Sequence, residues 1–266
     1  MKMFKFALIC ASALALVACQ PCAVCGEKPC VCGEKTEVCP DCGKNPCECP
    51  TGYVCPITVD DATADDWANV PEGYLFETKC AEGATWDALK SVKVFADDIY
   101  VNLLVEWDPE LITDLTSVPF HVYWNVDAGA ETGGYGDQWV EPYDIDVLME
   151  GFFFAEETEG SGVGVPCLYE PGMFAYGGAY NTNEWNWSEL TAAGAFCFSQ
   201  HIGDNKMEIQ FLRELIPATW GDAFTVGFDI QQSWNSVGVL PNAPDDEVGA
   251  KVKAEKMLVK FYIPEE

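Results

Sequence analysis

The sequence predicts an all-β protein whose folded part, residues 57–266, is a single antiparallel β-sandwich. Short stretches in which apolar and polar residues alternate recur along this part, and period-two alternation is the signal of a half-buried strand. Gly, Asn, Asp and Pro separate these stretches, as expected for turns. No long stretch has the 3.6-residue period of an amphipathic helix. About nine to eleven short strands at this spacing are typical of a sandwich.

The clearest pair of strands lies within residues 120–151. Its first strand, 120–127, alternates four apolar residues with four others, which places the two sets on opposite faces of a sheet. A Gly-rich loop with Trp139 follows, and the alternation resumes at 145–149. A large aromatic residue in a loop above a polar sheet face is typical of a ligand platform and equally of a hydrophobic lid. The residues predicted on the polar face are His121, Tyr123, Asn125 and Asp127.

The remaining elements are mostly short strands. One helical turn is predicted at 213–216 and is ended by Pro217, which cannot continue a helix. Residues 181–190 and 231–241 are predicted to be loops that carry tryptophan. Further strands are expected at 57–60, at 91–95 and 99–107 (a hairpin), and at 152–154, 173–176, 196–198, 206–212, 224–230 and 257–263.

Residues 1–18 predict an export signal. A basic start is followed by an apolar core of about a dozen residues, which is too short to span a bilayer as a helix. The signal ends in Leu-Val-Ala before Cys19, a pattern that resembles the lipobox of bacterial lipoproteins. The resemblance implies cleavage before Cys19 and attachment of acyl chains such as palmitate, which would hold the protein on a membrane. Secretion without an anchor is the alternative.

The chain is strongly acidic. Removal of Lys2 and Lys5 with the signal would leave 12 of the 14 basic residues against 43 acidic ones, a net charge of −31. Such a charge repels phosphate backbones, so nucleic acid is excluded as a partner. It suits a neutral ligand, a divalent cation, or solubility alone.

Residues 19–56 contain a duplicated cysteine pattern. The spacing C-x2-C-x4-C-x-C occurs twice, seventeen residues apart, in a segment with almost no aliphatic residues that cannot bury a core without cross-links. Each repeat could close two disulfides or hold one zinc ion through four thiolates. We favour disulfides, because zinc ribbons separate their cysteine pairs by more residues, and we expect a compact spacer, with redox or metal sensing as an alternative. The cysteines concerned are Cys22, Cys25, Cys30, Cys32, Cys39, Cys42, Cys47 and Cys49.

Several short motifs within 57–266 resemble one family. Residues 57–60 with Asp66 and Trp67 match an opening of the form I-x-I-D-G…D-W, and 126–135 match a D-x-D…T-G-Y loop, in which only Asp127 of the paired aspartates is present. Residues 144–151 match G-x-D-Y-L-I-E-G, and 238–241 match G-x-L-P. Together they resemble the family-nine-like carbohydrate-binding modules of the DOMON-like sandwich group.

This resemblance implies a jelly-roll-like sandwich that binds sugar by stacking it on tryptophan. The C–H groups of a sugar ring pack on a flat indole, while its hydroxyls need carboxylates and amides nearby. The predicted ligand residues are loop tryptophans together with two residues of the polar sheet face: Trp139, Trp185, Trp187, Trp234, His121 and Tyr123. The predicted core tryptophans are Trp67, Trp107, Trp124 and Trp220. A solvated loop is the first interpretation of residues 127–137, and a calcium site formed by Asp127, Glu131 and Asp137 is the alternative.

Other sites are weaker alternatives. His121 is read first as a structural histidine. Some DOMON-like domains bind haem through methionine and histidine, which would pair His121 or His201 with Met149, Met173 or Met207. Disulfides are predicted between Cys55 and Cys80 and between Cys167 and Cys197. Carboxylates are too abundant for a glycosidase pair to be selected, so we do not predict an enzyme.

These features together predict an outer-membrane lipoprotein of a Gram-negative bacterium, facing the periplasm or the cell surface. Its sandwich would bind a neutral glycan without cleaving it and would concentrate that glycan for partner enzymes or glycan-uptake proteins. The alternative is a structural or adhesive surface protein whose tryptophans are all internal.

Overall fold

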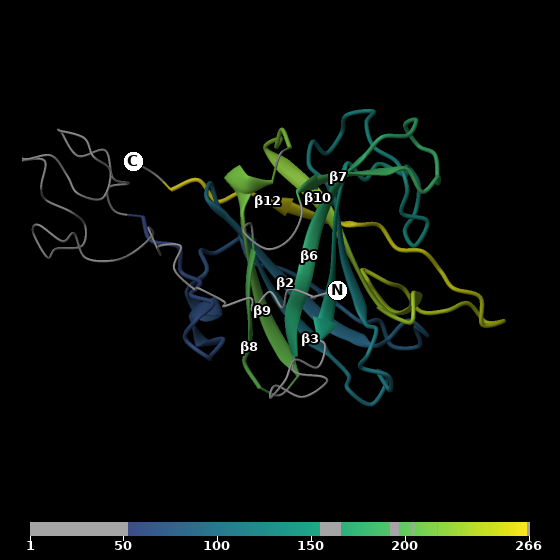
Figure 1. The fold of residues 1–266 in the computed structure, drawn as a ribbon, viewed down its shortest axis with the longest axis horizontal. Helices are drawn as coiled ribbons and strands as arrows, with labels where there is room; N and C mark the ends of the chain where they lie inside the picture. Colours follow the sequence, from purple (N-terminus) through teal and green to yellow (C-terminus); the bar gives the residue numbers. More distant parts are fainter. Residues whose placement is uncertain (1–52, 155–165, 192–196, 204, 217, 265–266) are drawn as a thin grey trace, which may run out of the picture. The chain divides into compact units, whose positions relative to one another are not determined.

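Two antiparallel sheets pack face to face in the computed structural model (Figure 1). This confirms the predicted all-β sandwich. Residues 55–266 form one compact unit. The export signal, Cys19 and the eight cysteines of the duplicated pattern lie outside the residues that the structure describes, which are 53–154, 166–191, 197–203, 205–216 and 218–264.

The smaller sheet has five strands in the order β1-β2-β3-β9-β8. A 3-10 turn, η2 (Asp65–Asn69), precedes it in the chain, and a second one, η3 (Arg213–Leu215), follows β9, where the sequence predicts a helical turn. The strands are β1 (Phe76–Lys79), β2 (Leu89–Ala96), β3 (Tyr100–Trp107), β9 (Lys206–Leu212) and β8 (Cys197–His201).

The larger sheet has seven strands. Its order is β11-β10-β4-β5-β6-β7, and β12 pairs with one end of β10. The strands are β4 (Pro119–Asn125), β5 (Val147–Phe154), β6 (Pro166–Tyr176), β7 (Trp187–Thr191), β10 (Ala223–Gln232), β11 (Asn235–Leu240) and β12 (Met257–Lys260).

The core between the sheets is built from the apolar set of each strand. On β4 this set is Phe120, Val122 and Trp124, all without exposed surface. Trp107 is also buried there, and Trp220 packs against the cluster while half-buried. Trp67 is buried too, so the prediction that these tryptophans are internal is confirmed for Trp67, Trp107 and Trp124.

Three segments differ from the prediction. Residues 57–60 form a loop, because the N–H of Thr58 donates to Asp66 Oδ2 (2.6 Å) instead of to a neighbouring strand. The loop predicted at 231–241 contains β11, since β10 and β11 form a tight hairpin closed by two residues. The loop predicted at 181–190 likewise ends in β7, which pairs with β6.

The predicted disulfides are wrong. Cys55, Cys80 and Cys197 carry free thiols, which excludes both the Cys55–Cys80 and the Cys167–Cys197 pairing. The Cys55 thiol accepts a hydrogen bond from Asn102 (3.8 Å). Burial raises the pKa of the Cys197 thiol to about 12 and that of Cys55 still further, so both stay protonated.

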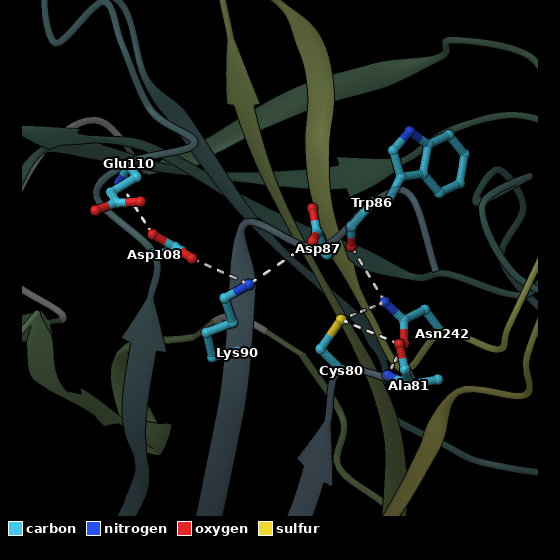
Figure 2. Close-up of polar contacts among 8 residues, drawn as sticks. All are labelled: Cys80, Ala81, Trp86, Asp87, Lys90, Asp108, Glu110 and Asn242. Atoms are coloured by element: carbon cyan, nitrogen blue, oxygen red, sulfur yellow. Dashed lines mark hydrogen bonds and ion pairs between the residues drawn. The ribbon is translucent and has the colours of Figure 1, made fainter. Parts of the chain in front are cut away.

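The side chain of Asn242 forms hydrogen bonds with Cys80 and with two residues near it. Figure 2 shows its Nδ2 donating to the carbonyl of Trp86 (3.1 Å) and to the Cys80 sulfur (3.5 Å). Its Oδ1 accepts the N–H of Ala81 (2.8 Å). One amide therefore fixes residues 80–86 to the chain that follows β11. In the same view Lys90, in β2, lies between Asp87 (3.7 Å) and Asp108 (3.2 Å).

A buried carboxyl group lies on the outer face of the five-stranded sheet. Glu208, in β9, is fully buried beneath η2, and its Oε1 accepts the indole N–H of Trp67 (2.6 Å). Its Oε2 has no hydrogen-bond partner among the described residues. Burial, followed by the charges of Asp66 and Asp61, raises the pKa of Glu208 to about 7.

We predict that the free energy of unfolding falls as the pH rises from about 5 to about 8. Glu208 has a higher pKa in the folded chain than in the unfolded chain. Well below pH 4.5 it is protonated in both states, so its ionisation does not lower the free energy of unfolding. Above the folded pKa it is ionised in a buried site, at a cost on the order of 1–3 kcal/mol. Urea unfolding at a series of pH values measures the effect.

The matched variants are Glu208→Gln and Glu214→Gln. The first removes the buried ionisable group and should reduce the pH dependence over this range, leaving the part that comes from other carboxyl groups whose pKa burial raises, such as Asp146. The second removes an exposed carboxylate and should leave the dependence as in the wild type. An unchanged pH dependence in Glu208→Gln would contradict the assignment.

Candidate functional site

The outer face of the seven-stranded sheet carries a row of polar residues at its centre. Strand pairing places His121 on β4 directly beside Asp229 on β10 and Glu150 on β5. Phe120 and Val122, the neighbours of His121 along β4, point into the core. His121 and the two residues paired with it, Asp229 and Glu150, therefore point away from the core. The polar face predicted for this strand is therefore present, but every residue of β4 is buried, because loops cover the outer face as well.

His121 connects a phenol to a carboxylate. Its Nε2 lies 2.9 Å from Glu150 Oε2, and its Nδ1 lies 3.1 Å from the hydroxyl of Tyr123. An ionised carboxylate only accepts hydrogen bonds, so we assign the proton to Nε2 and leave Nδ1 to accept from Tyr123. Burial raises the pKa of Tyr123 well above 10, which keeps its hydroxyl a donor. The chain of contacts fixes the position of Glu150.

Asp229 extends this network under the surface. It is fully buried, and its Oδ2 accepts from Gln231 (2.7 Å), Ser236 (2.9 Å) and Gln138 (3.4 Å). Burial raises its pKa. Gln231 also lies 3.3 Å from His121 Nδ1, so the two parts form one network. Asp229 has no surface to offer to a ligand, and its role is to hold its neighbours.

Trp139 covers this network. Its indole is fully buried, donates to the carbonyl of Pro241 (3.1 Å) and packs edge-on against Tyr123, with ring centroids 5.5 Å apart. The ring lies against Gly227 of β10, where an added Cβ would be only 2.3 Å from its Cζ2. The prediction that Trp139 is a ligand platform is therefore wrong. The signal that could have shown this is Gly227 itself, since glycine inside a strand often marks the close approach of another group.

Residues 241–256, which follow β11, hold the loop that carries Trp139 in place. The Lys251 ammonium lies 3.4 Å from the centroid of the Trp86 ring, and Lys256 pairs with Asp144 at 2.9 Å. The N–H of Val140, next to Trp139, donates to the carbonyl of Ala254 (3.0 Å). The ion pair and the backbone hydrogen bond attach residues 241–256 to the loop that carries Trp139, and the cation–π contact attaches the same segment to Trp86.

Two of the predicted loop tryptophans are exposed. Trp234, in the turn between β10 and β11, is 56% exposed, and Trp185, two residues before β7, is 59% exposed. Trp187 is half-buried. Between the two exposed indoles runs an aromatic row of Trp234, His121, Tyr123, Tyr135 and Trp185, with successive ring centroids 6.4, 5.6, 6.0 and 5.2 Å apart.

Trp234 occupies an unfavourable backbone position. It has a φ of +65° and the preceding Ser233 has a φ of +50°, because a two-residue hairpin turn needs positive φ at both positions. Asn-Gly normally fills such a turn, and a bulky residue there costs roughly 1–2 kcal/mol. Strain of this kind concentrates at functional sites. The ring has two neighbouring rings, Phe152 edge-on (6.0 Å) and His121 (6.4 Å), and is still 56% exposed, so it gains limited internal packing in return.

The three residues of the calcium alternative do not form a cluster of acidic side chains. No three acidic, histidine or cysteine side chains among the described residues come close enough to hold a metal ion. Glu131 and Asp137 are exposed, and Asp127 accepts a hydrogen bond from Thr132 (2.9 Å). The motif in the sequence places these residues on one loop, but the loop does not bring them together.

The haem alternative fails for a geometric reason. His121 lies on the outer face, whereas Met149 and Met173 lie in the core between the sheets. His201 is exposed and pairs across the strands with Met207, which has no exposed surface. None of these methionines can offer its sulfur to a haem beside either histidine.

Two surface hollows lie away from the aromatic row. One, of about 500 Å³, is lined by Arg213, Trp220, Asp98 and neighbouring residues. The other, of about 390 Å³, lies over the five-stranded sheet and is lined by charged residues that include Glu77 and Lys93. Neither contains a residue of the row.

Comparisons with protein-family models, with characterised proteins and with solved structures each found no match. The likeness to family-nine-like modules therefore stays a prediction from motifs. Among the residues that the structure describes, no helix has the length and apolar character needed to cross a membrane.

We predict that Gly227→Ala lowers the free energy of unfolding by about 1–3 kcal/mol, because the new methyl group displaces the buried Trp139 ring. Urea unfolding measures the change. In a Trp139→Ala background the same substitution should cost little, since the obstructing ring is gone. An equal cost in both backgrounds would show that Trp139 does not lie on Gly227.

Proposed function

We propose that this domain binds a neutral carbohydrate at Trp234 and Glu150 and does not cleave it. The observation that carries the proposal is an exposed indole, held in a strained turn, beside a carboxylate whose position is fixed from below. A structural role does not account for Trp234, because glycine would fit its backbone position better.

The two residues supply complementary contacts. The exposed face of Trp234 offers a flat apolar surface for the C–H groups of a sugar ring. The side chain of Glu150 is 23% exposed, and His121 occupies one acceptor site of its Oε2. A carboxylate has about four acceptor sites, so others are available to the hydroxyls of a sugar. Because Glu150 is held in place before binding, little ordering is needed when the ligand arrives.

Charge favours a neutral ligand. The chain has a formal net charge of −29, and Glu150 adds a negative group at the site itself. An anionic glycan would be repelled, whereas hydroxyl groups donate hydrogen bonds without carrying charge.

The arrangement favours binding over hydrolysis. Glycosidases use two carboxyl groups on either side of the scissile bond. Asp229, the neighbouring carboxyl group of the network, is fully buried and cannot reach a bound sugar. Capture is the role that this pair supports.

The same proposal places the domain on the outer membrane through acylated Cys19. The cysteine-rich segment 19–56 would act as a spacer, and the tether would raise the local concentration of glycan for partner enzymes or glycan-uptake proteins.

We predict that Trp234→Gly weakens binding at least about tenfold without loss of stability. The substitution removes the platform and also relieves the positive φ, so the free energy of unfolding should stay the same or rise. Affinity electrophoresis in gels containing hydroxyethyl cellulose, neutral xylan, galactomannan or soluble starch identifies a retarding glycan. Trp234→Gly should lower affinity for that glycan at least about tenfold, or about 1.4 kcal/mol.

Phe198→Ala is the matched control. Phe198 is an exposed aromatic residue, 50% exposed, on β8 of the other sheet. Its removal should leave binding unchanged, whereas Glu150→Gln should weaken it. Undiminished affinity in Trp234→Gly would contradict the proposed site, and a wild-type protein retarded by none of the glycans would favour the structural or adhesive alternative.

A further inference from the structure

The two exposed tryptophans lie at opposite ends of one sheet face. Trp234 follows β10, and Trp185 precedes β7, which is four strands away in the order β10-β4-β5-β6-β7. Neighbouring strands are about 4.8 Å apart, so β10 and β7 are separated by roughly 19 Å. A single sugar ring, which is about the size of the six-membered ring of an indole, cannot touch both tryptophans.

The surface between them is half-exposed and largely aromatic. From the Trp234 side, Phe152 and Glu150 of β5 come first, and both are half-buried. On β6, Gly172 lies opposite Glu150 and leaves room for the Phe174 ring, whose Cε2 would be 3.1 Å from a Cβ at position 172. We name this surface the outer-face strip; it consists of Trp234, Phe152, Glu150, Phe174, Trp187, Tyr135 and Trp185.

Hydrogen bonds and ring contacts hold the Trp185 end of the strip. Asn181, at a φ of +57°, accepts the N–H of Tyr143 through its side chain (2.8 Å). The N–H of Tyr135 donates to the carbonyl of Thr182 (2.7 Å), and the Tyr176 hydroxyl lies 2.8 Å from Thr182 Oγ1. Tyr135 and Trp187 then pack edge-on against Trp185, with centroids 5.2 and 6.2 Å away. Both exposed indoles are thus mounted on ordered backbone.

We propose that the outer-face strip binds the interior of a linear neutral polysaccharide, with one sugar stacked on Trp234 and another, several units along the same chain, on Trp185. This inference rests on the proposed carbohydrate function and specifies its ligand. A surface with exposed indoles at both ends and half-buried aromatic side chains between them suits a chain that continues past both tryptophans. A monosaccharide would need an enclosing pocket, and neither surface hollow includes a residue of the strip.

Both ends contribute to affinity only when one ligand reaches both. Two sites joined by one chain bind more tightly than either alone, because the second contact becomes intramolecular. The strip therefore predicts a steep dependence of affinity on chain length, which a site confined to Trp234 and Glu150 does not.

The test uses oligosaccharides of one to six units derived from whichever of the four glycans retards the protein. Isothermal titration calorimetry should show affinity rising at least tenfold between the disaccharide and the hexasaccharide. Trp185→Ala should lower affinity for the hexasaccharide at least tenfold and leave the disaccharide affinity unchanged. Trp234→Gly should lower both, and Phe198→Ala should change neither.

The outcomes separate this inference from the proposed function. Equal affinity for the disaccharide and the hexasaccharide, or full hexasaccharide affinity in Trp185→Ala while Trp234→Gly still weakens binding, overturns the strip and leaves the Trp234 site standing. Full affinity in Trp234→Gly overturns both. Because Trp185 is 59% exposed, its substitution should not change the midpoint of urea unfolding. If the midpoint does change, the titration is repeated with Trp185→Phe, which keeps an aromatic ring and should retain binding.

Discussion

The packing of Trp139 on Gly227 is the contact on which the functional face depends. A strand residue with a side chain at position 227 would hold the indole away from the sheet. With glycine there, the ring seals the outer face and creates a second, smaller hydrophobic cluster with Tyr123, Ile145, Leu148 and Val239. The loop that carries Trp139 is thereby fixed over the sheet, and residues 241–256 fix it from the other side. The seven-stranded sheet is therefore buried on both faces over much of its centre.

This burial gives the polar network its character. His121, Tyr123 and Asp229 are removed from water, and buried polar groups are costly unless they are paired. They are hydrogen-bonded to one another and to neighbouring side chains, although Asp229 Oδ1 has no hydrogen-bond partner among the described residues. The result is a support in which Glu150, hydrogen-bonded to His121, keeps part of its side chain exposed. The strain at Trp234 is the complementary feature, because it keeps an indole outside the structure at the edge of this support. The strained turn at Ser233 and Trp234 lowers the stability of the fold, and the packing of the Trp139 loop on the sheet offsets this cost.

Much of the strand pattern could be predicted from the sequence because alternation is a local property. The strands around Phe120, Met207 and Phe224 are where the periodicity predicts them, and Trp107 and Trp124 are internal as their positions on strands require. The prediction was wrong where local preference competes with a partner further along the chain. Asp66 takes the N–H of Thr58 and prevents a strand, and residues 235–240 become a strand because β10 provides an edge. Cysteine spacing likewise gave no information on pairing, since burial of Cys55 and Cys197 needs no bond between thiols.

The sequence by itself determined the sandwich, the polar set on β4 and the aromatic content of the loops, because each depends on residue type and on a period of two. It could not distinguish Trp139 from Trp234, since both lie in loops rich in turn-forming residues. Only the tertiary structure decided that one indole is buried and the other exposed. The reason is physical: the burial of a loop side chain is set by the space on the surface beneath it, and Gly227, on a strand about ninety residues away, provides that space for Trp139 alone.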